Sequence, residues 1–253
     1  MALEIDRIYN QDCLVGMRDV PDKSVDMILC DLPYGTTRKN EWDSVIPFDK
    51  LWVQYKRVIK SGGAILLTCQ IPFTIDVANS NREWLRYEWI WEKTTPTGFL
   101  NANRMPLKCH ENILVFYDSL GPYHPQGLGF GKKQATGGNS SCYDADSDYA
   151  GKSQSSTGYV NYPRDVLRYS KDSDNGHPTA KPVALFEYLI RTYTDEGDTV
   201  LDNCMGSGTT AVACIRSGRH FIGFETDEGY CKIANERISK TSAVYDNNLE
   251  RWL

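Results

Sequence analysis

The side chains at positions 31–34 could together hold a flat ring that carries an amino group. They are Asp31, Leu32, Pro33 and Tyr34. The Asp31 carboxylate can accept a hydrogen bond from the amino group. Pro33 restricts Leu32 to an extended conformation, which fixes the direction of the Leu32 carbonyl, a second acceptor. Tyr34 offers a face for stacking. Two acceptors on one NH2 group would draw its nitrogen toward tetrahedral geometry and free its lone pair for attack.

These four residues directly follow a short apolar run, residues 25–30, whose composition predicts a buried strand. In a doubly wound α/β sheet, ligands bind just past the carboxyl ends of the strands. The alternative is a simple turn, in which Asp31 caps the backbone and Tyr34 packs, since Asp and Pro are common turn formers. The four residues alone favour neither interpretation.

A second segment, residues 200–210, has the pattern of a strand, a glycine turn and the start of a helix. Gly206 and Gly208 let the backbone approach a ligand closely, and a helix N-terminus favours negative charge such as a ligand carboxylate. The next predicted strand ends at Glu225, about 20 residues further on, where an acid commonly binds ribose hydroxyls. This half-site suits a ligand that contains adenosine.

Two other nucleotide sites are excluded by the same segment. The Gly-Lys-Ser/Thr of a phosphate-binding P-loop is missing, and Gly-Ser-Gly lacks the third glycine of a dinucleotide fingerprint. The remaining alternative is an ordinary strand-to-helix turn with a capping acid.

Composition bounds the class of protein. The 253 residues suffice for one large α/β domain, or one domain with an inserted piece. No apolar run approaches membrane-spanning length and the N-terminus lacks a signal pattern, so we expect a cytoplasmic protein without a membrane partner. The eight cysteines form no C-x-x-C pair and there are four histidines, so no metal site is expected.

The net charge of −5 by itself argues against a nucleic-acid-binding protein. Residues 82–171, however, contain 11 Lys and Arg against 9 Asp and Glu. A mildly basic middle beside an acidic scaffold is compatible with DNA binding through one face, and equally with chance.

Strands and helices alternate along most of the chain, which predicts an α/β fold with a doubly wound, mainly parallel sheet and helices on both faces. The predicted strands are residues 4–9, 25–30, 64–69, 87–91, 112–117, 199–202 and 221–225. The predicted helices are residues 13–19, 47–60, 72–81, 181–193, 208–217 and 228–240. Residues 121–160 contain 8 of the 20 glycines and interrupt this rhythm. We therefore expect a catalytic and cofactor-binding domain at 1–118 and 175–253, and an irregular insert at 119–174 that reads the target and is disordered in part.

Four motifs, in this order, resemble the amino-group DNA methyltransferases of the permuted β class. They are Asn-Gln-Asp-Cys-Leu at 10–14, Asp-Leu-Pro-Tyr at 31–34, His-Pro-Thr-Ala-Lys-Pro at 177–182 and Gly-Ser-Gly-Thr-Thr at 206–210. The resemblance covers roughly residues 5–118 and 175–240; the ordered set is specific, whereas any one motif alone is weak.

The resemblance implies an S-adenosylmethionine-dependent enzyme. Residues 31–34 would hold the target base, Glu225 the cofactor ribose, and Asp12 would lie near the cofactor adenine. Lys181 has the charge to bind the carboxylate at the methionine end. The other expected cofactor-binding residues are Thr179, Pro182, Asp202, Gly206, Ser207, Gly208 and Thr209. Leu32 stands where the family has its first proline. Asn203-Cys204 stands where the family commonly has Pro-Phe, so at that position a ring contact to the cofactor is lost.

The expected activity is site-specific methyl transfer to N6 of adenine in duplex DNA, with the base flipped out of the helix. Family members with Asp at the first motif position mostly modify adenine N6, and those with Ser tend to modify cytosine N4. The alternatives are N4-cytosine methylation, transfer to RNA or a protein amide, and a non-catalytic DNA-binding protein.

Duplex DNA is the expected partner, with Lys39, Trp42, Arg104 and Lys108 as candidate contacts; for any one charge, a solvated surface position is the alternative. A homodimer and a partner endonuclease of a restriction–modification system are further expectations from the resemblance. All of these expectations require that the motif at 31–34 and the turn at 206–209, about 170 residues apart, meet in one pocket.

Overall fold

The structure, a computed structural model, describes residues 3–35, 44–132, 157–172 and 180–249, with side chains to residue 244. The chain forms two compact units, residues 1–124 with 165–253, and residues 125–164. The predicted insert at 119–174 is longer than the second unit. Its β8 (Val166–Tyr169) belongs to the first unit, where it pairs in parallel with β4 (Leu85–Thr97) of the main sheet.

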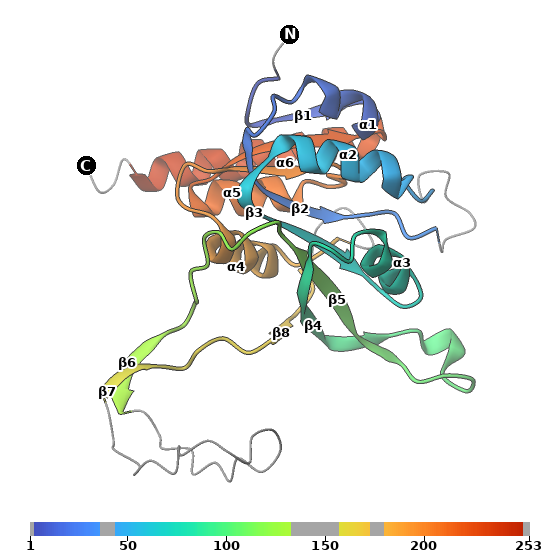
Figure 1. Cartoon of the computed structure of the whole chain (residues 1–253), viewed down its shortest axis with the longest axis vertical. Helices are drawn as coiled ribbons and strands as arrows, with labels where there is room; N and C mark the ends of the chain where they lie inside the picture. The colour runs from blue at the N-terminus through green and yellow to red at the C-terminus, as the bar shows by residue number, and fades with distance from the viewer. Residues whose placement is uncertain (1–2, 36–43, 133–156, 173–179, 250–253) are drawn as a thin grey trace. The chain divides into compact units, whose positions relative to one another are not determined.

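An eight-stranded sheet forms the centre of the first unit, in the order β1-β10-β9-β2-β3-β5-β4-β8 (Figure 1). Its other strands are β1 (Arg7–Asn10), β2 (Val25–Asp31), β3 (Ile59–Cys69), β5 (Lys108–Phe116), β9 (Thr199–Asp202) and β10 (His220–Glu225). Neighbouring strands are parallel, except that β5 is antiparallel to both β3 and β4. The predicted fold class is thus confirmed.

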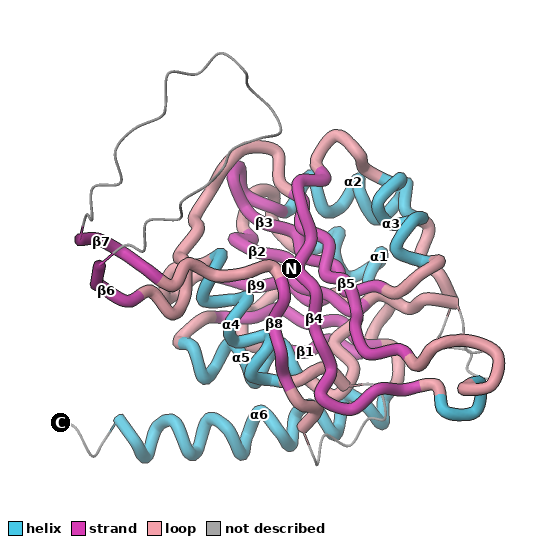
Figure 2. Tube along the Cα trace, turned by 90° about the horizontal axis from the view of Figure 1, so that it is seen from below, coloured by secondary structure: helices cyan, strands magenta, loops and turns pink. Residues whose placement is uncertain are grey.

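Helices cover both faces of this sheet (Figure 2). One face packs on α1 (Cys13–Gly16), α2 (Phe48–Val58) and α3 (Phe73–Ser80). The other packs on α4 (Val183–Tyr193) and α5 (Thr209–Ser217). The long α6 (Glu228–Leu249) contacts α5 and β1.

The alternation of side chains along a strand explains why β2 is apolar throughout. Ile28 and Cys30 enter the core beneath α1–α3, whereas Met27 and Leu29 enter the core beneath α4 and α5. All four side chains are fully buried. Because β2 packs into the cores on both faces of the sheet, its last residue, Asp31, has a fixed position at the carboxyl ends of the parallel strands.

Several element boundaries differ from the sequence prediction. The helix expected at 47–60 ends at Val58, because β3 begins at Ile59 and runs through Gly62 and Gly63. Strands β4 and β5 extend to Thr97 and back to Lys108, well beyond the predicted ranges 87–91 and 112–117, around a 3-10 turn at Phe99–Asn101. Polar residues in these extensions hide the strand pattern.

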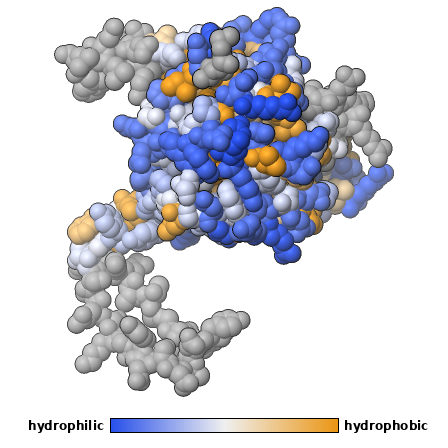
Figure 3. All heavy atoms as spheres, turned by 45° about the horizontal axis from the view of Figure 1, so that its top comes forward, coloured by the Kyte–Doolittle hydropathy of each residue, from blue (hydrophilic) through white to orange (hydrophobic). Residues whose placement is uncertain are grey.

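The second unit contains the antiparallel pair β6 (Gly129–Lys132) and β7 (Thr157–Val160). The Phe130 and Tyr159 rings lie edge to face across it, with centroids 6.0 Å apart. In the space-filling view most of the described surface is hydrophilic, and apolar residues form small separate groups (Figure 3). None of the described helices is both long and apolar enough to cross a bilayer.

Candidate active site

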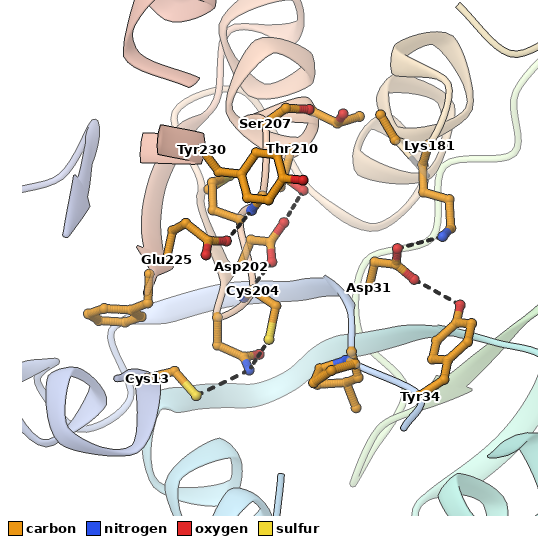
Figure 4. A pocket seen from close by; sticks show the side chains of 18 of the residues that line it. Cys13, Asp31, Tyr34, Lys181, Asp202, Cys204, Ser207, Thr210, Glu225 and Tyr230 are labelled. Atoms are coloured by element: carbon orange, nitrogen blue, oxygen red, sulfur yellow. Dashed lines mark hydrogen bonds and ion pairs between the residues drawn. The ribbon is translucent and has the colours of Figure 1, made fainter. Parts of the chain in front are cut away.

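A cavity of about 610 Å³ opens at the carboxyl ends of three parallel strands. Each of these strands ends in an acid that lines it: Asp31 on β2, Asp202 on β9 and Glu225 on β10. This is the edge at which ligands bind in doubly wound sheets. The motif at 31–34 and the glycine turn share this cavity (Figure 4), so the two distant segments meet as predicted.

Most of the predicted site residues line the cavity: Asp12, Asp31, Leu32, Pro33, Tyr34, Lys181, Asp202, Gly206, Ser207, Thr209 and Glu225. Gly208 and Pro182 do not line it but precede α5 and α4 as their N-caps. Arg104 and Lys108 are exposed outside it. The remaining predicted residues, Lys39, Trp42 and Thr179, lie outside the described residues.

The glycine turn needs its glycines for two reasons. Gly206 and Gly208 both have positive φ, +51° and +84°, and a Cβ at Gly208 would lie 2.9 Å from the Cβ of Ala234 on α6. The Gly206 amide donates to Glu225 Oε2 at 2.7 Å, which joins the turn to the end of β10. Among the described residues no side chain caps α5, so its first amides are available to an anion.

Asn203 connects the turn to the helices on the opposite face, at the position where the family commonly has proline. The Tyr55 hydroxyl of α2 donates to Asn203 Oδ1 at 2.5 Å, and Asn203 Nδ2 lies 3.4 Å from Cys204 Sγ and 3.7 Å from Cys13 Sγ. Burial raises the pKa of the nearby Cys30 thiol to about 12. Buried hydrogen bonds therefore hold this turn in place of a proline ring.

Asp31 is held by three side chains. Its Oδ1 accepts hydrogen bonds from the Tyr34 hydroxyl at 2.8 Å and from the Thr68 hydroxyl, and its Oδ2 accepts one from Lys181 Nζ at 2.5 Å (Figure 4). A carboxylate has about four lone-pair sites, so the donors among the described residues leave one for a ligand. The Tyr34 ring stacks on Phe73 with centroids 5.0 Å apart, so a base can stack only on its other face.

A chain of alternating buried charges continues from Asp31. Lys181 Nζ also lies 3.3 Å from Glu111 Oε2, and Lys93 Nζ lies 2.6 Å from Glu111 Oε1. The side chains of Lys93, Glu111 and Lys181 are 4%, 8% and 6% exposed, which makes this a buried network. Burial alone would raise the pKa of Glu111, but Lys181 and Lys93 hold it below its ordinary value. Burial would likewise lower the pKa of Lys181, but Asp31 and Glu111 raise it.

Lys93 and Glu111 also line the cavity, although no sequence motif marks them. The alternation of side chains along a strand, with a period of two residues, could have identified both. Trp89 and Trp91 are buried on one face of β4, and two places further on is Lys93. Glu111 precedes Ile113 and Val115 of β5 in the same way. A charged side chain in line with the buried residues of a strand needs a partner of opposite charge, because burying an unpaired charge costs free energy.

Asp202 is the only fully buried residue of the three strand-end acids. Its Oδ2 accepts a hydrogen bond from the Thr210 hydroxyl at 2.5 Å and its Oδ1 accepts one from the Cys204 amide at 3.0 Å. Burial outweighs these hydrogen bonds and raises the pKa of Asp202 to about 6. A buried acid with a raised pKa inside a cavity is a mark of a functional site.

Solved structures with the same fold include a complex with S-adenosylmethionine and a DNA methyltransferase. M1.HpyAVI, solved as a complex with S-adenosylmethionine, superposes with a TM-score of 0.62 at 24% identity, over 91% of this chain and 98% of its own. The cytosine-N4-specific PvuII DNA methyltransferase superposes with a TM-score of 0.65 at 16% identity, over 98% and 94%. Fold and cavity therefore define an S-adenosylmethionine-dependent methyltransferase fold.

The chain belongs to the N6/N4 DNA methylase family, since the model of that family matches residues 25–236. It is 28% identical to the DNA adenine methyltransferase YhdJ of Escherichia coli K12, over 94% of this chain and 84% of that protein. It is 25% identical to the type II methyltransferase M.HinfI of Haemophilus influenzae, over 92% and 68%. The predictions of the enzyme class and of S-adenosylmethionine, the methyl donor of this family, are confirmed.

Substituting Glu111→Gln should destabilise the protein by about 3 kcal/mol, because it leaves two buried ammonium groups facing each other. Adding Lys93→Met should restore at least about 1 kcal/mol, because the Asp31–Lys181 pair then remains alone. Urea unfolding of the single and double variants measures this coupling. Glu196→Gln, at an exposed position, is the control, and strictly additive losses would show that the charges act independently.

Substituting Asp202→Asn should make stability less dependent on pH. Because the folded-state pKa lies above the unfolded-state value, the stability from Asp202 is complete below about pH 4 and is lost as the pH rises through about 6. The rise from 3.8 to about 6 corresponds to about 3 kcal/mol. The ligand-free variant should therefore be more stable than wild type at pH 7.5, and the difference should shrink toward pH 5. An equal difference at both pH values in urea unfolding would contradict the assignment.

Proposed function

We propose that the protein transfers a methyl group from S-adenosylmethionine to N6 of adenine in duplex DNA, at a specific sequence. The observation that carries this proposal is the shared cavity, which Asp31 and Leu32 line together with Gly206 and Ser207 of the glycine turn. One segment is suited to an exocyclic amine, and the other to an adenosine-containing ligand.

The cavity residues fit the cofactor. The volume of about 610 Å³ lies within the range of small-molecule sites. Glu225 accepts the amides of Gly206 and Asp227 through different oxygens, so each oxygen has a further lone pair for a ribose hydroxyl. The uncapped end of α5 suits a carboxylate. When bound, the cofactor supplies a methyl group already activated by a positively charged sulfur.

Lys181 has a different role in this proposal from the one suggested by the resemblance. Its ammonium contacts two carboxylates of the protein, Asp31 and Glu111, and so we assign it to orienting Asp31. The methionine carboxylate is then left to the amides at the start of α5. This assignment keeps Lys181 at the boundary between the base and the methyl donor.

The chain's own residues contribute by positioning rather than by covalent chemistry. Asp31 accepts one hydrogen of the amino group through its remaining lone pair, and the Leu32 carbonyl accepts the other. The Leu32 side chain is 3% exposed and packs in the core, so it anchors the carbonyl direction that Pro33 sets. The amino nitrogen gains the methyl group and loses one proton, which passes to solvent on the Asp31 side.

Adenine is favoured by Asp31 at the first motif position and by the name of the relative from E. coli. Cytosine N4 is the second candidate, since the PvuII enzyme shares the fold. Lys39, Trp42, Arg104, Lys108 and the region 119–174 are proposed DNA contacts. A homodimer, a cognate restriction endonuclease and a cytoplasmic location complete the proposal.

Asp31→Ala should reduce methyl transfer at least about 100-fold, because the amino group loses a charged acceptor, while affinity for S-adenosylmethionine stays within about 3-fold. Methylation-sensitive long-read sequencing of a host that expresses the gene gives base and site together, and nucleoside mass spectrometry of duplexes containing that site gives the rate. Asp31→Asn keeps the shape of the side chain and should lose activity as well.

Asp49→Ala, at an exposed position on α2, is the matched control and should retain full activity. Turnover by Asp31→Ala at the wild-type rate would remove Asp31 from the mechanism. Cofactor binding by the wild type without methylation of any duplex would instead favour a non-catalytic DNA-binding protein.

A further inference from the structure

The turn between β4 and β5 carries an exposed apolar tip that the catalytic site does not use. Phe99, Leu100 and Met105 are 64%, 102% and 50% exposed. Figure 1 shows both strands continuing past α3, away from the helices that cover the sheet. Large apolar side chains that project together from a soluble protein indicate an interaction surface.

The tip has a fixed shape. Within the turn, Asn101 accepts the amides of Arg104 and Met105 at 2.9 and 3.1 Å, and the Asn101 amide donates to the Gly98 carbonyl at 2.9 Å. Gly98 adopts a φ of +96°, which permits this reversal. The apolar side chains are therefore presented by an ordered turn, as an inserting element requires.

The charge of the hairpin points to a polyanion. Between Lys93 and Glu111 the chain contains Arg104 and Lys108 and no Asp or Glu. Both basic side chains are exposed. In a protein with a net charge of −5, a segment of 17 residues, 94–110, without a carboxylate is suited to a phosphate backbone.

The base of the same hairpin belongs to the cavity. Thr97 lines it, and Lys108 Nζ lies 3.4 Å from Oε1 of Gln70, another lining residue. Leu100 follows Thr97 by three residues, so its Cα lies within about 11 Å of the cavity wall. That reach is close to the width of a major groove, about 12 Å. A duplex whose base entered the cavity would thus bring its stack to the tip.

We propose that Leu100, supported by Phe99 and Met105, is a wedge that enters the base stack of duplex DNA and stabilises the gap left by the flipped base. Apolar side chains are known to insert between base steps in this way. This inference rests on the proposed function and adds the element that separates the base from its stack. Arg104 and Lys108 would hold the adjacent phosphates.

The test compares Leu100→Ala with wild type on two duplexes that contain the mapped methylation site. One is fully paired, and the other has an abasic site opposite the target base, so that the base is already unpaired. On the paired duplex kcat should fall roughly 10-fold, because the gap loses a stacking partner. On the unpaired duplex kcat should stay within about 2-fold of wild type, because a base that is already unpaired leaves the stack at a lower cost in free energy. Nucleoside mass spectrometry gives both rates.

Val53→Ala removes an apolar side chain that is 64% exposed on α2, outside the hairpin, and should leave both rates unchanged. Arg104→Ala should weaken affinity for both duplexes alike, because a phosphate contact does not depend on base pairing. These two variants separate the wedge from general surface effects and from simple docking.

An equal loss on the two duplexes, or no loss on the paired one, would overturn the wedge while leaving the proposed function intact. A loss that accompanies a change of oligomeric state in sedimentation would assign the tip to a contact between two copies of the chain. Absence of methylation by the wild type on both duplexes would overturn the proposed function itself, and the wedge with it.

Discussion

Without the Lys181 ammonium, two carboxylates would face each other in the wall of the cavity. Lys181 Nζ lies 2.5 Å from Asp31 and 3.3 Å from Glu111, and Lys93 completes the balance at 2.6 Å from Glu111. The four residues come from β2, β4, β5 and the segment before α4, so one network of charges fixes the relative positions of four segments. Apolar packing brings the strands together, but these charges determine where the Asp31 oxygens point.

Such a network costs free energy to bury, and replacement by apolar residues of similar size is often neutral or stabilising. Its presence at a ligand cavity is therefore better explained by what it orients than by stability. The same reasoning applies to Asp202, whose pKa is raised to about 6 by burial. Acidic side chains thus line the cavity at the ends of three strands. A base and a methyl donor must be aligned there, and water must be excluded.

The sheet and the two main motifs could be predicted because local patterns determine them. Apolar runs mark β2 and β9, and glycines with positive φ mark the turn. Lys93 and Glu111 could not be placed by motif, since each is a single charge in a strand and only the pairing of β4 with β5 brings them together. The role of Asn203 was hidden for the same reason, because its partner Tyr55 lies on a distant helix. The four-residue β8 follows the glycine-rich residues 121–160, and only its alternate residues Leu167 and Tyr169 are partly buried, so its pattern is too short to predict a strand.

The central claim is that an exocyclic amine and a methyl donor occupy one cavity, and a bisubstrate ligand tests it directly. In such a ligand an adenine is joined through N6 to the 5′ position of a second adenosine. Calorimetry should show that it binds at least about 10-fold more tightly than adenosine alone, because two sub-sites are filled at once. Asp31→Asn should remove most of that gain. Equal affinity of the two ligands for the wild type would show that base and cofactor do not share the cavity.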